Sequence, residues 1–365
     1  MSSRILVASG DLSEINSKYM PLVSDVISEG KLIGGRHVTQ FENQLSEYVG
    51  TKHAISVASG MDALILAIQA FNFTPKSRIA VLYCGGGYAS LAVLSCGHVP
   101  VFCDSTTSDI QMDFSDLIKL ENISCVIVTH LYGQLSEISQ ILEWALQKKI
   151  RVIEDCAQAF GAERNEKLAG SFGDVGCFSF YPTKNLGGIG DGGGVVTNSD
   201  EIAESIARRK QYGWGVRYNV DLKDGRNSRL DAINAVVLSA KMMEIDSMNR
   251  KRREIFSKYL DADSTKTLFP NQKLDSTNVV HLAVGLCSDP DDLIDYFSKA
   301  GIEVGKHYPV PDSKQDGLNY LSEKRATPNA DWICRSNVTF PLYPHLTEHQ
   351  VNHVASTINK WVNRE

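Results

Sequence analysis

Three polar residues sit among apolar runs of the chain at positions where they could do chemistry. Asp155 ends one apolar run, Ser179 lies inside a second, and Lys184 stands just past the end of that second run. A lysine amine forms a Schiff base with a carbonyl group when burial or a nearby cation lowers its pKa. An acid, a hydroxyl and a lone lysine at strand ends therefore suggest a site built around an aldehyde cofactor.

Pyridoxal 5'-phosphate (PLP) is such a cofactor, and it places further demands on its site. A carboxylate must keep the pyridine nitrogen protonated, so that the ring can take up carbanion electrons. Hydroxyls and helix-start N–H groups must hold the phosphate. Asp155 suits the first demand, and Ser179 with the helix-start turn Ser59-Gly60 suits the second. The residues alone leave another interpretation open, in which Asp155 is a structural acid and Lys184 a surface lysine.

Short apolar runs alternate with helical patterns through the first two thirds of the chain. Strands are predicted at 53–57, 78–82, 99–104, 125–129, 151–154, 178–181 and 194–197. This alternation is typical of an α/β protein with a mostly parallel sheet and helices on both faces. Ligands of such sheets bind beyond the carboxyl ends of the strands. One crevice at that edge is expected to collect Ser59, Tyr88, Asp104, His130, Asp155 and Lys184.

The character of the sequence changes after a long predicted helix that opens at 227–231 and runs to about residue 253. A chain of 365 residues suits one large domain plus a smaller one. We expect residues 1–245 to form a large PLP-binding α/β domain and residues 246–365 a small C-terminal α+β domain. The N-terminal segment 1–35 is expected to pack near the small domain.

Composition argues against several classes of protein. The net charge of −6 and the lack of a basic cluster make nucleic acid an unexpected partner. No apolar run reaches the roughly 18 residues of a membrane span, and residues 1–5 lack the layout of a signal peptide. The eight cysteines include no Cys-x-x-Cys pair, so we expect free thiols in a reducing cytoplasm and no metal site.

Three motifs, in this order, resemble the DegT-type (DegT/DnrJ/StrS) family of PLP-dependent sugar-nucleotide aminotransferases. They are Glu154-Asp-Cys-Ala-Gln-Ala-Phe-Gly-Ala162, Phe178-Ser-Phe-Tyr-Pro-Thr-Lys-Asn-Leu186 and Gly190-Asp-Gly-Gly-Gly-Val-Val-Thr197. Less specific matches at 130–134, 225–231 and 307–311 extend the similarity over nearly the whole chain. The resemblance implies a fold-type I aminotransferase, with a mostly parallel, seven-stranded type of sheet and a smaller C-terminal α+β domain.

The resemblance also implies roles for individual residues. Lys184 would be the Schiff-base lysine and the proton carrier, and Asp155 would pair with the pyridine nitrogen. Gln158 would lie against the cofactor, near its phenolic oxygen or its ring face. Family members with histidine at the lysine position are dehydratases, so Lys184 argues for transamination.

Further roles are implied for the phosphate. Ser179, Ser59 and the backbone N–H of Gly60 would hold it within one subunit. Asn227 would reach a cofactor phosphate in the neighbouring subunit, which implies a homodimer with shared active sites. A simpler interpretation of Asn227 is that it only caps the helix that follows it.

Candidate substrate contacts come from segments outside the three motifs. His307 and Tyr308 would approach the sugar, although a Tyr-Pro pair can also simply shape a loop. Arg217 is a candidate for binding a diphosphate or the carboxylate of the amino donor. His130 is a candidate at a strand end, where a histidine is often only structural.

The chain departs from the family pattern in two places. Met61 stands where the family usually has threonine, so the phosphate loses one hydroxyl contact, worth roughly 1.5–3 kcal/mol. Gly85 and Gly86 stand where the family has threonine and an aromatic residue that stacks on the ring. Tyr88, two residues on, is the candidate replacement. A glycine loop also lets the backbone approach a bulkier ligand, so it bears on substrate identity.

We predict PLP-dependent transamination of a nucleotide-linked keto-deoxysugar, with L-glutamate as amino donor and pyridoxamine 5'-phosphate as the intermediate cofactor form. The stretches 10–19 and 30–35 resemble members that aminate C3, which slightly favours a dTDP-3-keto-6-deoxyhexose. Three alternatives stay open. They are a 4-keto sugar as acceptor, a cyclitol ketone as acceptor, and a non-catalytic regulatory descendant that binds a sugar nucleotide.

Overall fold

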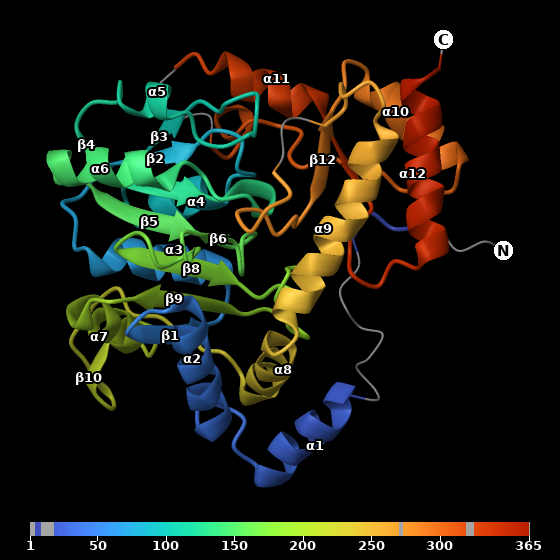
Figure 1. Ribbon diagram of the computed structural model, residues 1–365. Helices are drawn as coiled ribbons and strands as arrows, with labels where there is room; N and C mark the ends of the chain where they lie inside the picture. The colour runs from blue at the N-terminus through green and yellow to red at the C-terminus, as the bar shows by residue number, and fades with distance from the viewer. Residues whose placement is uncertain (1–3, 9–17, 270–272, 319–324, 365) are drawn as a thin grey trace.

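A seven-stranded sheet forms the centre of the larger part of the molecule (Figure 1). The computed structural model describes residues 4–8, 18–269, 273–318 and 325–364, so most of the stretch 10–19 lies outside the described residues. The strand order is β1-β9-β8-β5-β4-β2-β3. The strands are β1 His53–Val57, β2 Arg78–Leu82, β3 Val99–Cys103, β4 Ile123–Thr129, β5 Arg151–Asp155, β8 Val175–Ser179 and β9 Gly193–Thr197.

The pairing of these strands is mostly parallel, as predicted. Strands β3, β2, β4, β5 and β8 pair in parallel, whereas β9 runs antiparallel to both of its neighbours, β8 and β1. Parallel strands that are covered on both faces form continuous apolar runs in the sequence. Six of the seven predicted strands agree with the structure within two residues at each end. In this arrangement β1, β2, β4, β5 and β8 all end at the same edge of the sheet.

The predicted strand 178–181 is out of place, because β8 begins at Val175 and ends at Ser179. The preceding Gly-Asp-Val-Gly sequence resembles a turn, but Gly176 is part of the strand. A Cβ atom at Gly176 would lie 2.4 Å from the Cα atom of Gly170, so only glycine lets the two segments pass each other. The strand ends at Ser179 because Phe180 turns away toward the glycine-rich segment, where its N–H donates to the carbonyl oxygen of Gly192.

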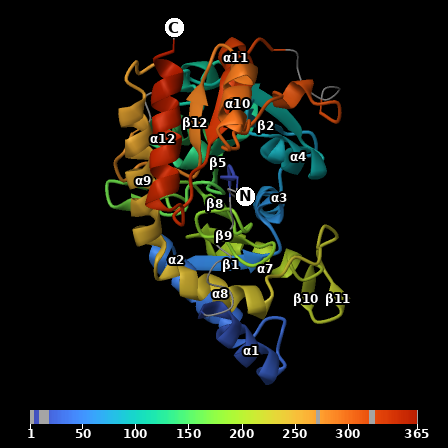
Figure 2. The ribbon, with the colours of Figure 1, turned by 90° about the vertical axis from the view of Figure 1, so that its right-hand side faces the viewer.

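Helices cover both faces of the sheet (Figures 1 and 2). Those of the larger part are α1 Met20–Glu29, α2 Arg36–Val49, α3 Gly60–Ala70, α4 Tyr88–Ser95, α5 Phe114–Leu117, α6 Ile138–Lys148, α7 Asp200–Arg209 and α8 Ala232–Met242. Helix α3 is buried along most of its length and packs against β8 and β9. Short ladders lie outside the sheet: β6 Glu163–Arg164 with β7 Lys167–Leu168, and β10 Trp214–Val216 with β11 Asn219–Val220.

The single long helix predicted from residue 227 is two helices in the structure. Helix α8 ends at Met242, and α9 Ile245–Ala262 begins after a break at residues 243–244. Helix α9 packs along α12 Glu348–Val362 (Figure 1). The remaining elements of this part are β12 Ala283–Leu286, α10 Pro290–Lys299, α11 Pro328–Ser336 and β13 Asn337–Phe340. An apolar core that includes Phe256, Tyr259, Phe297 and Phe340 holds these elements together.

The N-terminal segment contacts both parts of the molecule. Ile5 forms a bridge with Ile302 and is buried in the same core as Phe297. Helix α1 instead packs on α8, where Val23 and Val237 are buried together. None of the described helices combines the length and the apolar character needed to cross a membrane. All eight cysteines carry free thiols, and six of them are buried, as expected.

The start of β9 lies unusually close to the turn that opens α3. A Cβ atom at Gly193 would lie 2.2 Å from the carbonyl oxygen of Ser59. Because this oxygen belongs to the backbone, no change of side-chain rotamer can relieve the contact. Gly190 belongs to the same glycine-rich turn but has open space around it.

We therefore expect Gly193→Ala to lower the free energy of unfolding by roughly 3 kcal/mol, as overpacking does in well-packed sites. Gly190→Ala is the matched control, and it should change that free energy by less than about 1 kcal/mol. Urea denaturation followed by circular dichroism measures both values. Equal effects of the two substitutions would show that the approach of β9 to α3 is not a packing constraint.

Candidate active site

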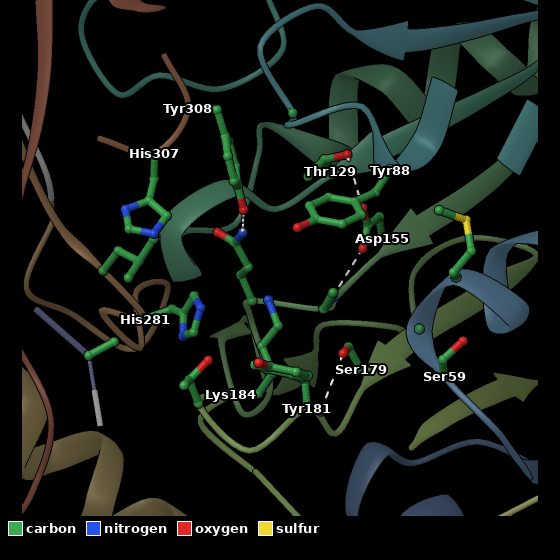
Figure 3. A pocket seen from close by; sticks show the side chains of 18 of the residues that line it. Ser59, Tyr88, Thr129, Asp155, Ser179, Tyr181, Lys184, His281, His307 and Tyr308 are labelled. Atoms are coloured by element: carbon green, nitrogen blue, oxygen red, sulfur yellow. Dashed lines mark hydrogen bonds between the residues drawn. The ribbon is translucent and has the colours of Figure 1, made fainter. Parts of the chain in front are cut away.

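A cavity of about 520 Å³ opens at the sheet edge where β4, β5 and β8 end (Figure 3). It collects most of the residues predicted for the site. Those that line it are Ser59, Gly60, Met61, Tyr88, Asp155, Gln158, Ser179, Lys184, His307 and Tyr308. Arg217 and Asn227 are exposed and lie outside this cavity. Arg217 is part of the β10–β11 hairpin, with its guanidinium over the ring of Tyr218.

The predicted crevice was wrong for two strand-end residues. Asp104 is buried away from the cavity, where its carboxylate accepts hydrogen bonds from the N–H groups of Asn329 and Ala330 at the start of α11. His130 is fully buried and does not line the cavity either. Both residues directly follow strands at the right edge. The start of α11 covers Asp104, and His130 is hydrogen-bonded to Glu154 in the interior.

Asp155 is the last residue of β5, and it is only 8% exposed. Its carboxylate accepts hydrogen bonds from the N–H of Ala157 at 3.1 Å and from the hydroxyl of Thr129 at 3.4 Å. Burial raises the pKa of Asp155, whereas the N–H of Ala157 and the charge of Lys184 act in the opposite direction. A cationic group placed against this carboxylate would therefore be stabilised strongly, because little water screens the pair.

Lys184 lines the same cavity, and burial lowers the pKa of its amine to about 8. The Asp155 carboxylate raises that pKa only in part. At neutral pH about a tenth of the amine is therefore unprotonated, which is the form that attacks a carbonyl. The lysine follows β8 through the turn at residues 180–183, and its N–H donates to the carbonyl oxygen of Tyr181, so the sheet fixes its position.

The start of α3 and the end of β8 together form an anion-binding corner. The Ser59 hydroxyl caps α3 by accepting from the N–H of Asp62 at 3.1 Å. A Cβ atom at Gly60 would lie 2.7 Å from Cβ of Ser179, so glycine is needed for the helix start to reach β8. Helix-start N–H groups and two hydroxyls at one point suit a phosphate. Met61 lines this corner without adding a hydroxyl.

Gln158 is held between two parts of the cavity wall. Its side-chain oxygen accepts from the N–H of Tyr132 at 2.7 Å, and its Nε2 donates to the hydroxyl of Tyr308 at 3.0 Å. His307 is held from the other side, where its Nδ1 lies 3.0 Å from the hydroxyl of Thr339. Burial lowers the pKa of His307, so this imidazole is neutral near pH 7.

The unusual glycine loop brings two tyrosine rings to the cavity. Gly86 and Gly87 both have positive φ angles, 80° and 86°, and the turn that they form starts α4 at Tyr88. A Cβ atom at Gly86 would lie 2.9 Å from the ring of Tyr308, so the missing side chain makes room for that ring. The rings of Tyr88 and Tyr308 meet edge to face with centroids 6.1 Å apart (Figure 3).

A buried carboxylate locks this loop in place. Asp312 accepts from the N–H of Gly87 at 2.9 Å and from the hydroxyl of Ser90 at 2.6 Å. It therefore caps the start of α4 from a segment more than 200 residues later in the chain. The contact ties the segment that carries His307 and Tyr308 to the sheet.

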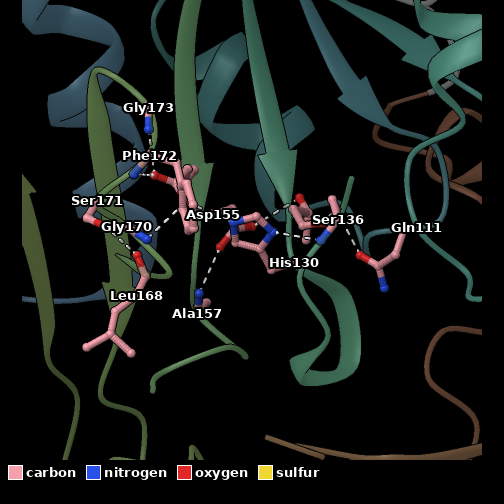
Figure 4. Close-up of polar contacts among 12 residues, drawn as sticks. Gln111, His130, Ser136, Asp155, Ala157, Leu168, Gly170, Ser171, Phe172 and Gly173 are labelled. Atoms are coloured by element: carbon pink, nitrogen blue, oxygen red, sulfur yellow. Dashed lines mark hydrogen bonds and ion pairs between the residues drawn. The ribbon is translucent and has the colours of Figure 1, made fainter. Parts of the chain in front are cut away.

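Glu154, next to Asp155, is the centre of a buried hydrogen-bond network. Figure 4 labels the residues that donate to it, His130, Gly170, Phe172 and Gly173. One oxygen accepts from the N–H groups of residues 172 and 173, and the other accepts from the N–H of residue 170. The N–H of Ser136 donates to Nδ1 of His130, so Nε2 of His130 carries the proton and donates to Glu154 at 3.0 Å. Although Cys156 lies near enough to complete a metal-ligand group, these four donors already occupy the carboxylate.

Several residues that line the cavity were not identified from the sequence. They are Ala8, Leu64, Thr129, Ala157, Tyr181, Thr183, Asp191, Arg252, His281, Leu282, Leu342 and Tyr343. Tyr181 and Thr183 belong to a recognised motif and could have been included. Arg252 also had a detectable pattern, because it shares the buried stripe of α9 with Ile245, Phe256 and Tyr259. His281 had none, because it comes from a segment without regular structure.

Comparison with known proteins identifies the family. The sequence profile of the DegT/DnrJ/EryC1/StrS aminotransferase family matches residues 13–359. The chain belongs to this family. A relative from Aneurinibacillus thermoaerophilus, dTDP-3-amino-3,6-dideoxy-alpha-D-galactopyranose transaminase, is 34% identical over 361 residues, which cover 96% of this chain and 98% of the relative. A second, from Micromonospora megalomicea subsp. nigra, is dTDP-3-amino-3,4,6-trideoxy-alpha-D-glucose transaminase, 31% identical with 93% of both chains covered.

Solved structures of DegT/DnrJ/EryC1/StrS aminotransferases agree with this assignment. The crystal structure of S. venezuelae DesV in complex with a ketimine intermediate matches with a TM-score of 0.94 and 30% identity, covering 100% of both chains. The predicted fold-type I architecture and the predicted PLP-dependent aminotransferase activity are thereby confirmed. The acid, amine and anion-binding corner of the cavity fit PLP, with Asp155, Lys184 and Ser59 as the residues that would hold it.

The lowered pKa of Lys184 predicts a distinctive chemical reactivity. In cofactor-free protein, modification of Lys184 by trinitrobenzenesulfonate should be half-maximal near pH 8. An ordinary lysine reaches this point near pH 10.4. Peptide mapping by mass spectrometry, with the exposed lysines as internal reference, gives the profile. Reactivity of Lys184 that follows the exposed lysines would contradict the burial effect.

The network at Glu154 predicts a loss of stability in an isosteric variant. Glu154→Gln places an amide NH₂ against backbone N–H donors, so we expect the free energy of unfolding to fall by roughly 3 kcal/mol. Glu254→Gln, at an exposed position on α9, is the control and should have little effect. Urea denaturation measures both, and an unchanged midpoint for Glu154→Gln would contradict the role of this carboxylate as the acceptor of the four hydrogen bonds.

Proposed function

We propose that this aminotransferase is a cytoplasmic enzyme that moves the amino group of L-glutamate onto a nucleotide-linked keto-deoxysugar. The preferred acceptor is a dTDP-3-keto-6-deoxyhexose, and the product is an amino sugar for a surface polysaccharide or a glycosylated metabolite. One observation carries the reaction type: a lysine amine with a lowered pKa and a buried carboxylate line the same cavity. The acceptor rests on the names of the relatives, which include two dTDP-3-amino-sugar transaminases.

PLP, when bound, supplies an electron sink for the carbanion that forms as the amino group moves. The residues of the chain supply the rest. Asp155 would keep a proton on the pyridine nitrogen, because its buried carboxylate pairs with a cation at low cost. The Lys184 amine would carry the proton between the two carbon positions. Ser59 and Ser179 would hold the phosphate, and Gln158 and Tyr88 would lie against the ring.

The acceptor would enter past His307 and Tyr308. Burial lowers the pKa of His307, so a neutral imidazole is available to hydrogen-bond the hydroxyl groups of a sugar. Tyr88 is 51% exposed, which leaves an aromatic face for the sugar or the nucleoside at the mouth of the cavity. A volume of about 520 Å³ lies within the range of small-molecule sites.

We further propose that the enzyme is a homodimer with shared active sites. Asn227 and Arg217 are exposed, and neither residue lines the cavity of its own chain. Apolar side chains on the neighbouring hairpin and turn are exposed as well, among them Val216 at 72% and Tyr218 at 74%. Exposed apolar side chains near polar ligand candidates are typical of a subunit interface. In such a dimer Asn227 would approach the phosphate of the partner's cofactor.

A panel of keto substrates tests the proposed reaction. Protein reconstituted with PLP should show a yellow absorbance band that L-glutamate bleaches. It should then convert dTDP-3-keto-6-deoxyhexoses more efficiently than 4-keto sugars or cyclitol ketones, as measured by mass spectrometry of the product. Preference for another ketone would refute only the choice of acceptor. If both the band and any product are absent, the proposed aminotransferase activity is refuted, and a non-catalytic regulatory descendant is favoured.

The shared site can be tested by mixing two inactive variants. Lys184→Ala removes the amine, and Asn227→Asp places a negative charge next to the partner's phosphate. If the sites are shared, co-refolded mixed dimers contain one site with both residues intact, and up to about a quarter of wild-type activity should return. Each variant refolded alone is the control. No recovery in the mixture, with dimers present, would contradict a role for Asn227 across the interface.

A further inference from the structure

His281 is a buried imidazole in the wall of the cavity, and only one of its two ring nitrogens has a partner. The side chain is 6% exposed and belongs to the segment that leads into β12. Its Nδ1 lies 2.9 Å from Oδ1 of Asn185, the residue that follows Lys184. Its Nε2 makes no hydrogen bond with any described residue and is open to the cavity.

Two buried asparagines determine which nitrogen of His281 carries the proton. Nδ2 of Asn249 donates to the carbonyl oxygen of Phe160 at 3.0 Å, so Oδ1 of Asn249 is left as an acceptor. It accepts from Nδ2 of Asn185 at 2.8 Å, and the same Nδ2 donates to the carbonyl oxygen of Val279 at 3.1 Å. Oδ1 of Asn185 can then only accept, so Nδ1 of His281 must be the donor.

The imidazole therefore presents an unprotonated Nε2 to the cavity. Burial lowers the pKa of His281 well below its usual range, and the nearby cations Lys184 and Arg252 lower it further. The neighbouring imidazole of His307 acts in the same direction. The ring is thus neutral at neutral pH, with its single proton on Nδ1. A buried acceptor without a donor costs free energy, and a donor that comes within reach removes that cost.

The amine of Lys184 is a donor that can reach this acceptor. Its Nζ forms no hydrogen bond with any described residue, and the side chains of Lys184 and His281 both project into the cavity (Figure 3). The charge of Lys184 acts on His281 more strongly than that of Arg252 does. The chain also links the two groups, because the residue that holds His281 is the immediate neighbour of Lys184.

The Lys184 amine needs such a partner at one stage of the reaction only. While it is joined to the cofactor aldehyde, that bond fixes its position. Once a substrate amine has displaced it, the long side chain is free to rotate. The amine must nevertheless stay close to the reacting carbon atoms in order to move the proton between them. An acceptor at a fixed position in the wall would keep it there.

We propose that His281 is a positioning residue whose Nε2 accepts a hydrogen bond from the Lys184 amine each time this amine leaves the cofactor. The inference rests on the proposed function, since it concerns a step that both half-reactions share. Asn185 and Asn249 act through His281, because they keep its proton on Nδ1 and its Nε2 available as an acceptor.

Titration of Lys184 in cofactor-free protein tests the proposal without any catalysis. His281→Phe keeps a ring that excludes water but has no acceptor. A hydrogen bond stabilises an ammonium group, so the pH of half-maximal modification of Lys184 by trinitrobenzenesulfonate should fall by roughly one unit in this variant. His281→Gln can place an amide oxygen at the Nε2 position, so its shift should be smaller. His349→Gln, at an exposed position on α12, is the control and should cause no shift.

Either of two results would overturn the proposal. One is a midpoint for His281→Phe that rises or stays within about 0.3 pH unit of the wild-type value. The other is a crystal structure of the wild-type protein with pyridoxamine 5'-phosphate in which the Lys184 amine binds elsewhere. This cofactor form has no aldehyde to hold the lysine, so we expect Nζ within about 3.2 Å of Nε2 of His281. The crystal structure also decides the question if His281→Phe does not fold.

Kinetics of the PLP-loaded enzyme separate this role from substrate binding. Because Lys184 is released in both half-reactions, kcat should fall roughly tenfold in both for His281→Phe, while the KM values of L-glutamate and of the amino-sugar nucleotide stay unchanged. A change confined to the KM of one substrate would contradict the proposal. Failure of the proposed function gives a different result, since a wild-type protein without transaminase activity would still show the shift in the titration of Lys184.

Discussion

Everything in the site depends on holding an acid and an amine together in a place that water barely reaches. Asp155 and Lys184 line one cavity, and burial pushes their pKa values toward each other, upward for the carboxyl group and downward for the amine. In water the same pair would be a fixed ion pair of little chemical use. The sheet maintains the unfavourable burial because Asp155 ends β5 and Lys184 follows β8 after the turn at residues 180–183, and the apolar residues of both strands are buried in the core.

The parts of the molecule that surround this pair serve it from different directions. The start of α3 provides the anion-binding corner. It can approach β8 only because Gly60 has no side chain, and β9 only because Gly193 has none. The loop that carries Tyr308 is tied to the sheet by the Asp312 cap on α4. Helix α9 brings a buried guanidinium to the far wall. One side of the cavity is thus formed by residues at the ends of the sheet strands, and the other sides are formed by residues from the later part of the chain.

The sequence was informative wherever the structure follows from local pattern. Apolar runs predicted the strands, and the motifs from Glu154 to Thr197 predicted the acid, the amine and their cofactor. Prediction failed where distant segments decide. A strand-end position did not reveal that the start of α11 covers Asp104, or that His130 is hydrogen-bonded to Glu154 in the interior. The tyrosine that fills the space above Gly86 comes from more than 200 residues away in the chain. No local pattern could report such a contact.

The central claim is that the buried carboxylate of Asp155 makes the cofactor reactive. The most direct test is the single-turnover rate at which L-glutamate bleaches PLP-loaded Asp155→Asn, measured by stopped-flow absorbance beside wild type. The asparagine amide has the same shape as the carboxylate but no negative charge, so it cannot stabilise the protonated pyridine nitrogen by charge. The account predicts that the variant still binds PLP on Lys184, while the bleaching rate falls about 10³-fold, or roughly 4 kcal/mol of barrier. A variant that bleaches within tenfold of the wild-type rate would contradict it.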